Sequence, residues 1–291
     1  MKRNYWLTIV GCLVATTIWA QGRSETITKS LEVKNKNIEF WFCVCNINGS
    51  VEVEAYDGNT VEVTLEKRVN ARSGDDIDLG MEELQLRVSE NDDFIRLSVE
   101  SPNQRITEKQ DPLRCGWDWN GESERRDYWY TMDYKIKVPK GISVKLSTVN
   151  KGEVFAKGVT GNVYASNVNG DITLEDIQGD TKVNTVNGKV EVSYVKMPTE
   201  FASFKTVNGD IEIFLPGDGS GIFNFESRWG EVYSDLDFSK KLAPKVTKSA
   251  EGKTTKFKVA NSNSYQYGTS GGASFDFETL NGDVYLRKQK R

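Results

Sequence analysis

Histidine is absent from this sequence of 291 residues, and only four cysteines and six prolines are present. Without histidine, the chain lacks the commonest general base and every imidazole ligand for a metal ion. The formal net charge of −4 argues against a nucleic-acid partner. After the first twenty residues, no run is long and apolar enough to span a membrane. Charged residues make up 27% and hydrophobic residues 37%, as is typical of a folded globular chain.

Residues 1–20 have the pattern of a signal peptide. Lys2 and Arg3 give a basic start, Tyr5–Trp19 is mostly apolar, and the segment ends on a small residue suited to cleavage. We therefore expect an exported chain that is periplasmic, at the outer surface or secreted. A lipoprotein is the alternative, because the four residues ending at Cys12 resemble a lipobox.

A nine-residue repeat occupies residues 151–196. Glycine recurs at Gly152, Gly161, Gly170, Gly179 and Gly188. Two apolar columns follow the glycines, and because alternate strand residues face the same way, both columns should point inward. Their members include Ile172, Leu174, Val183, Val190 and Val192. A third apolar column comprises Val159, Val168, Ile177, Val186 and Val195.

Each nine-residue unit reads as one short strand and one turn, in which glycine should supply a positive φ. The units alternate, since Asn167–Gly170 resembles Thr185–Gly188 eighteen residues later. We therefore predict an all-β fold, a β-solenoid or rolled two-sheet β-repeat with about 18 residues per turn. A meander of plain β-hairpins is the alternative, because Asn-Gly is also a strong hairpin signal.

Two regions divide the chain after the leader. Residues 21–140 form an N-terminal β region with a loop rich in aromatic residues and cysteine, and residues 141–291 form the β-repeat region. We expect residues 21–291 to make one continuous domain. Within the first region, the polar stretch Arg72–Asp78 is predicted to be a loop. The repeat continues more loosely after Lys196, and its last unit begins at Thr279 near the C-terminus.

The repeat resembles a family of secreted bacterial β-repeat proteins that are named as candidate adhesins, a domain family of unknown function. The resemblance rests on the recurring Thr-Val-Asn-Gly units, on Tyr134–Pro139 before them and on Leu280–Asp283 near the C-terminus. It covers roughly residues 30–288. It implies a β-repeat fold outside the cytoplasm and brings no catalytic residues, because its motif consists of turn and core positions.

Aromatic residues gather in an otherwise irregular segment between Pro102 and Thr131. Trp117, Trp119, Trp129 and Tyr130 lie there among charged residues. Aromatic faces can bind sugars or partner proteins, so these four residues are the predicted ligand-binding surface. The alternative is a loop that folds back and covers the core with the same rings.

Three cysteines follow the leader, namely Cys43, Cys45 and Cys115. Cys43 and Cys45 share one face of a strand and are poorly placed to bond each other. In an oxidising compartment, either of them could form a disulfide with Cys115. Three buried, reduced cysteines are the alternative.

The recurring polar residues do not predict a metal or cofactor site. The residue after each repeat glycine varies too much to supply calcium ligands, and three sulfurs without histidine do not make a complete zinc site. Asparagines precede several turn glycines, and we expect turn formers that tolerate left-handed backbone rather than a ligand ladder. They are Asn48, Asn169, Asn187, Asn208 and Asn281.

We therefore expect a non-enzymatic, adhesin-like protein with a structural or binding role at the bacterial cell envelope. Its partner would be an unidentified envelope protein or glycan. A carbohydrate-active enzyme on a β-solenoid is the alternative. The adjacent carboxylates Asp75 and Asp76 do not favour it, because neighbouring strand or turn residues point apart and do not form an acid/base pair by spacing alone.

Overall fold

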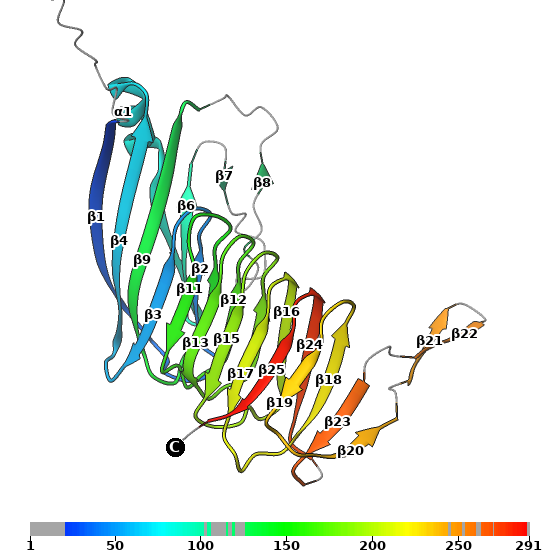
Figure 1. The fold of residues 1–291 in the computed structure, drawn as a ribbon. Coiled ribbons are helices and arrows are strands. Elements are labelled where there is room, and N and C mark those ends of the chain that lie inside the picture. The colour runs from blue at the N-terminus through cyan, green and yellow to red at the C-terminus, as the bar shows by residue number, and fades with distance from the viewer. Residues whose placement is uncertain are drawn as a thin grey trace, which may run out of the picture.

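A computed structural model describes residues 21–101, 104–105, 115, 118–119, 126–243, 246–251, 254–259, 263–269 and 271–289. These residues form two large β-sheets, which run side by side through the molecule with the core between them (Figure 1). The predicted signal peptide, residues 1–20, lies outside the described residues.

Ten strands form sheet A and eleven form sheet B. Sheet A has the order β1 (Gln21–Glu32), β4 (Thr60–Ala71), β9 (Tyr128–Pro139), β3 (Val51–Tyr56), β11 (Val154–Lys157), β13 (Ile172–Ile177), β15 (Val190–Tyr194), β17 (Ile211–Leu215), β25 (Val284–Lys288) and β19 (Val232–Ser234). Sheet B has the order β20 (Phe238–Leu242), β23 (Asn263–Tyr267), β18 (Gly221–Ser227), β24 (Ala273–Asn281), β16 (Phe201–Asn208), β14 (Thr181–Asn184), β12 (Val163–Ser166), β10 (Ser143–Ser147), β2 (Trp41–Cys45), β6 (Phe94–Glu100) and β5 (Gln85–Glu90). Two small hairpins pair β7 (Gln104–Arg105) with β8 (Asp118–Trp119) and β21 (Val246–Glu251) with β22 (Thr254–Val259).

The repeat region is a stack of rungs, each of which contributes one strand to each sheet. Strands of successive rungs are parallel, and Val154 pairs with Ile172 in sheet A just as Val163 pairs with Thr181 in sheet B. Both steps are 18 residues, which confirms the predicted length of one turn. The two-sheet form of the prediction is therefore the observed one, and the hairpin meander is excluded for these rungs.

The predicted inward columns form the core between the sheets. Ile172, Leu174, Val183, Val190 and Val192 are each no more than 1% exposed. Along every repeat strand, buried residues alternate with partly exposed ones, as the period of two requires. The predicted register is therefore confirmed.

The five glycines of the nine-residue repeat are required for a reason other than the positive φ predicted, which Gly209 and Gly282 do adopt in later rungs. Gly170 and Gly188 do not have a positive φ. Instead, a Cβ atom added at Gly188 would lie 2.2 Å from the carbonyl oxygen of Gly170, and one added at Gly170 would lie 2.3 Å from that of Gly152. Glycine is needed because the backbones of successive rungs approach each other too closely for any side chain.

The rungs do not follow one another in chain order throughout. After the rung of β16 and β17, the chain first builds β18 and β19, and then returns with β24 and β25. The returning strands insert between these two rungs, so that β24 pairs with both β16 and β18. Ile211 therefore pairs with Val284, 73 residues away, in a register that the local repeat does not encode.

The predicted loop at Arg72–Asp78 is wrong, because a helix, α1 (Gly74–Glu83), begins inside it. The Ser73 hydroxyl caps this helix by accepting a hydrogen bond of 3.1 Å from the backbone N–H of Asp76. Asp75 and Asp76 lie in its first turn, where negative charge interacts favourably with the helix dipole. Among the described residues, no helix is both long enough and apolar enough to cross a membrane.

Candidate functional site

A line of apolar side chains follows the edge of the stack where the chain passes from sheet B to sheet A. We call this line the turn ridge. It consists of Val149, Val168, Val186, Val207, Leu280 and Trp229. Each residue occupies the same place in its turn, and each turn bonds to the next through the backbone: Asn187 N donates to Val168 O, and Asn208 N to Val186 O. The ridge therefore crosses six rungs in a straight row.

The middle of the turn ridge is exposed to solvent. Val168, Val186 and Val207 are 36%, 38% and 37% exposed. The third apolar column of the sequence is thus mixed. Val159 and Ile177, in turns from sheet A to sheet B, are almost completely buried, whereas Val195, in the last such turn of the repeat, is 46% exposed. Burial in the core accounts for Val159 and Ile177 but not for the exposed valines of the turn ridge.

A ladder of asparagine side chains runs beside the turn ridge. Each amide donates a hydrogen bond to the amide oxygen of the preceding rung, at 2.8 Å from Asn187 to Asn169 and 2.7 Å from Asn208 to Asn187. Asn169 continues the ladder to Asn150, and Asn281 donates to Asn208. None of these residues has the left-handed backbone that was expected of them. Their role in the turns is this side-chain ladder, which ties the rungs together.

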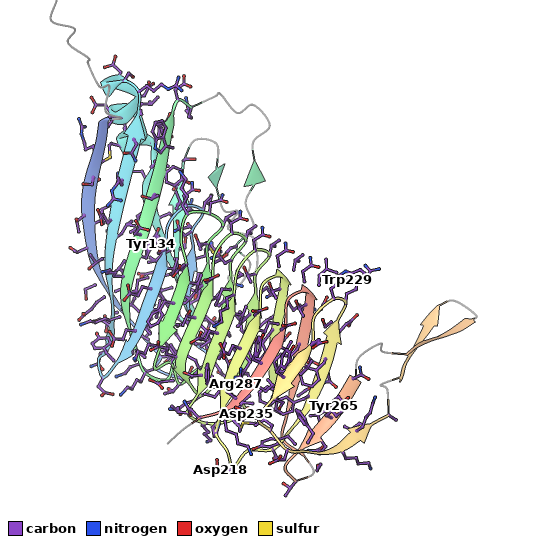
Figure 2. All side chains as sticks on the ribbon, in the orientation of Figure 1. Tyr134, Asp218, Trp229, Asp235, Tyr265 and Arg287 are labelled. Atoms are coloured by element: carbon purple, nitrogen blue, oxygen red, sulfur yellow. A yellow bond between two sulfur atoms is a disulfide. The ribbon has the colours of Figure 1, made fainter. Side chains whose placement is uncertain are left out.

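Trp229 ends the turn ridge at the last rung and is the most exposed large apolar residue of the described chain, at 76%. Its backbone N–H donates a 3.2 Å hydrogen bond to Leu280 O, so its turn follows directly on that of the neighbouring rung. Figure 2 shows the labelled Trp229 projecting from the edge of the stack. The turn Arg228–Gly230 belongs to the looser part of the repeat after Lys196, and nothing local in its sequence indicates that it forms the terminal rung.

A shallow groove of about 620 Å³ lies next to Trp229. Its walls combine ridge residues with charged ones, namely Thr206, Val207, Glu226, Ser227, Arg228, Glu278, Thr279 and Leu280. Glu226 and Glu278 pair across β18 and β24, and Lys205 forms an ion pair with Glu278. In the part of the chain that the structure describes, no three acidic or cysteine side chains converge on a possible metal site.

The four predicted aromatic residues do not form one described surface. Trp129 is 42% exposed, whereas Tyr130, next to it on β9, is 8% exposed and belongs to the core cluster. Burial raises the pKa of Tyr130 to about 12, against a smaller lowering by a hydrogen bond with Asn48. Trp119 lies on β8, where its backbone pairs with that of Gln104. Trp117 lies outside the described residues.

A disulfide bond joins Cys45 to Cys115, with their Cα atoms 5.4 Å apart. The sequence had left the choice between Cys43 and Cys45 open. Cys43 takes no part in this bond and is fully buried. The disulfide attaches the aromatic segment to β2 in sheet B, across a separation of 70 residues.

Comparison with known proteins identifies one sequence family. The model of the Toastrack DUF4097 family matches residues 133–287. No curated protein sequence matches the chain.

Several solved structures resemble the fold at low identity. A candidate cell adhesion protein from Clostridium sporogenes ATCC 15579 is 13% identical, with a TM-score of 0.41 over 92% of this chain and 100% of that chain. A candidate adhesin from Bacteroides fragilis NCTC 9343 is 10% identical, with a TM-score of 0.29 over 90% and 97%. A candidate lipid-binding protein from Parabacteroides distasonis ATCC 8503 is 11% identical, with a TM-score of 0.28 over 93% and 98%.

Proposed function

The chain belongs to the Toastrack DUF4097 family, and from this premise we propose that it is a non-enzymatic, extracytoplasmic binding module of the adhesin type. It acts at the bacterial cell envelope, and its partner is an envelope glycan or envelope protein. It holds that partner on the turn ridge, with Trp229 as the anchor. The single observation that carries this proposal is the row of exposed apolar side chains along one edge of the stack, where they do not pack into the core.

The dimensions and chemistry of the turn ridge suit binding. Six rungs at about 4.8 Å spacing give an apolar strip roughly 24 Å long. Exposed apolar strips with polar borders mark interaction sites, and tryptophan is enriched among the residues that dominate binding energy. The strip is bordered by the amides of the asparagine ladder, which can still accept or donate hydrogen bonds to a ligand.

The stack also holds the turn ridge rigid before any ligand arrives. Backbone hydrogen bonds of 2.8–3.0 Å join the turns of Val168, Val186 and Val207, and the amide ladder adds a second set. A preformed surface loses little conformational entropy on binding. The chemistry of the ridge does not favour catalysis there, because valine, leucine and amide side chains do not transfer protons at neutral pH.

Two features support the proposed location outside the cytoplasm. The disulfide between Cys45 and Cys115 is of a kind that persists in oxidising compartments. The basic and apolar leader predicted over residues 1–20 would direct the chain there.

A binding screen tests the proposed function. We expect the purified protein to bind members of a glycan array or solubilised envelope proteins, and to release no reducing ends from any polysaccharide that it binds. Cleavage of a bound polysaccharide by the pure protein would overturn the non-enzymatic assignment. Failure to bind any glycan or envelope protein would overturn the adhesin-type assignment.

A further inference from the structure

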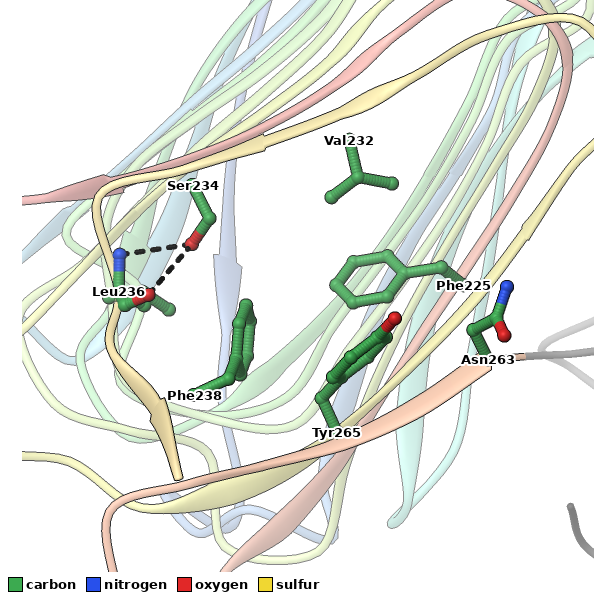
Figure 3. A pocket seen from close by; sticks show the side chains of 7 residues that line it. All are labelled: Phe225, Val232, Ser234, Leu236, Phe238, Asn263 and Tyr265. Atoms are coloured by element: carbon green, nitrogen blue, oxygen red, sulfur yellow. Dashed lines mark hydrogen bonds between the residues drawn. The ribbon is translucent and has the colours of Figure 1, made fainter. Parts of the chain in front are cut away.

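The two sheets end unequally at the rung of β18 and β19. Sheet A ends at β19, a three-residue strand, whereas sheet B continues beyond β18 with β23 and β20. Among the described strands of sheet A, none lies opposite these two. A cavity of about 400 Å³ opens there, which we call the open-end cavity (Figure 3).

The interior of the open-end cavity is apolar. The rings of Phe225, Phe238 and Tyr265 contact one another, with centroids 5.5–6.2 Å apart. Phe225 and Leu236 are almost buried, at 6% and 5% exposure, while Val232 is 40% exposed. Figure 3 shows these side chains surrounding the cavity. The volume and lining are typical of a site for a small apolar group.

A lysine ammonium group lies on the same face as these rings. Lys241 pairs with Tyr265 across β20 and β23, and residues directly opposite in an antiparallel pair point to the same face. The Lys241 Nζ atom lies 5.8 Å from the centre of the Tyr265 ring. Lys240 pairs instead with Gln266 and therefore points to the other face. The ammonium group of Lys241 thus lies beside the aromatic rings of the cavity, whereas that of Lys240 does not.

The charges around the open-end cavity leave Lys241 available to an anion. The nearby carboxylates of Asp235 and Asp237 are paired with Arg287 at 3.6 Å and with Lys288 at 3.1 Å. In the described part of the chain, no carboxylate lies within ion-pair distance of Lys241.

We propose that the open-end cavity binds a single-chain anionic amphiphile. Its apolar chain lies among Phe225, Leu236 and Phe238, and its anionic head contacts Lys241 Nζ. This site is separate from the turn ridge and does not depend on the function proposed there. The competing explanation is structural, because a lysine on an edge strand also prevents sheets from pairing edge to edge.

Binding of monomeric dodecanoate to the full chain tests this proposal by isothermal titration calorimetry. We expect dodecanoate to bind, and dodecyltrimethylammonium, which has the same chain and the opposite charge, to bind at least about tenfold more weakly. Lys241→Gln should weaken dodecanoate binding about tenfold, whereas Lys240→Gln, the matched control on the other face, should not change it. Leu236→Trp should block binding by filling the cavity. If that variant fails to fold, Lys241→Glu, a change at an exposed position, should abolish binding instead.

Three results would overturn the proposal. The first is no binding of dodecanoate by the unmodified protein. The second is equal weakening by Lys240→Gln and Lys241→Gln, which would indicate general surface attraction. The third is binding only to anionic phosphatidylglycerol vesicles and not to monomeric dodecanoate, which would indicate a membrane surface rather than a bound chain. If the protein binds both dodecanoate and the vesicles, and Lys241→Gln weakens this binding whereas Lys240→Gln does not, the proposed site is supported. Membrane lipid is then a second source of the apolar chain that occupies it.

Discussion

Replacing Ile172 with aspartate is expected to lower the free energy of unfolding by at least about 4 kcal/mol. Ile172 is completely buried at the start of β13, between Val154 and Val190 of the neighbouring rungs. The substitution removes apolar contacts and places a carboxylate where no partner can reach it. For a chain of this size, we expect the melting temperature to fall by roughly 10 °C or more.

Thr173→Asp is the matched control, one residue further along the same strand. Thr173 faces outward and is half-buried, and its neighbours in sheet A are Phe155 and Glu191. The new charge would lie opposite Glu191, so we expect a loss of up to about 1 kcal/mol. Thermal unfolding followed by circular dichroism measures both variants. Equal shifts for the two would show that the register of β13 is wrong.

Gly188→Ala is expected to destabilise the stack by about 3 kcal/mol, although only one methyl group is added. The new Cβ would lie 2.2 Å from the carbonyl oxygen and 2.6 Å from the carbonyl carbon of Gly170. The backbone cannot move aside freely, because Gly188 N donates to Asn208 O at 3.0 Å and Gly170 N donates to Asn187 O at 2.9 Å. The methyl group would therefore force neighbouring rungs apart at the turn.

Gly217→Ala separates this effect from a general cost of replacing glycine. A Cβ at Gly217 would meet no atom within 4 Å, and its φ is not in the left-handed region. We expect a change within about 0.5 kcal/mol. Urea denaturation of both variants provides the comparison. A Gly188→Ala protein as stable as Gly217→Ala would contradict the close approach of the rungs.

The rungs could be predicted from the sequence because two periodicities coincide there. Alternation along each strand identified Ile172 and Leu174 as inward residues, and the recurrence of similar turns identified the 18-residue step. The reason for the glycines could not be found in the same way. A steric requirement between Gly170 and Gly188 depends on the distance between two backbones, which only the stacked structure provides.

Other features were missed for different physical reasons. Helix α1 has few apolar positions, yet Ser73 followed by Asp76 is a recognisable helix-capping pair that could have located its start. The insertion of β24 beside β18 has no local signal, because strands of every rung carry the same alternating pattern. That insertion also decides which turn is terminal, so the exposure of Trp229 could not be anticipated.

The most direct test of the proposed binding surface compares two exposed tryptophans far apart in the fold. Trp229 lies at the end of the turn ridge, and Trp129 lies on β9 in the aromatic segment that the sequence favoured. Each is changed singly to alanine, and the dissociation constant for a glycan or envelope protein selected in the screen is measured by biolayer interferometry. Circular dichroism confirms that both variants keep their β-structure.

If the turn ridge is the binding surface, Trp229→Ala should lose about 2 kcal/mol of binding free energy, or roughly 30-fold in affinity, and Trp129→Ala should bind as the unmodified protein does. The reverse pattern, with affinity lost in Trp129→Ala and retained in Trp229→Ala, would contradict the account and place the binding surface on the aromatic segment instead.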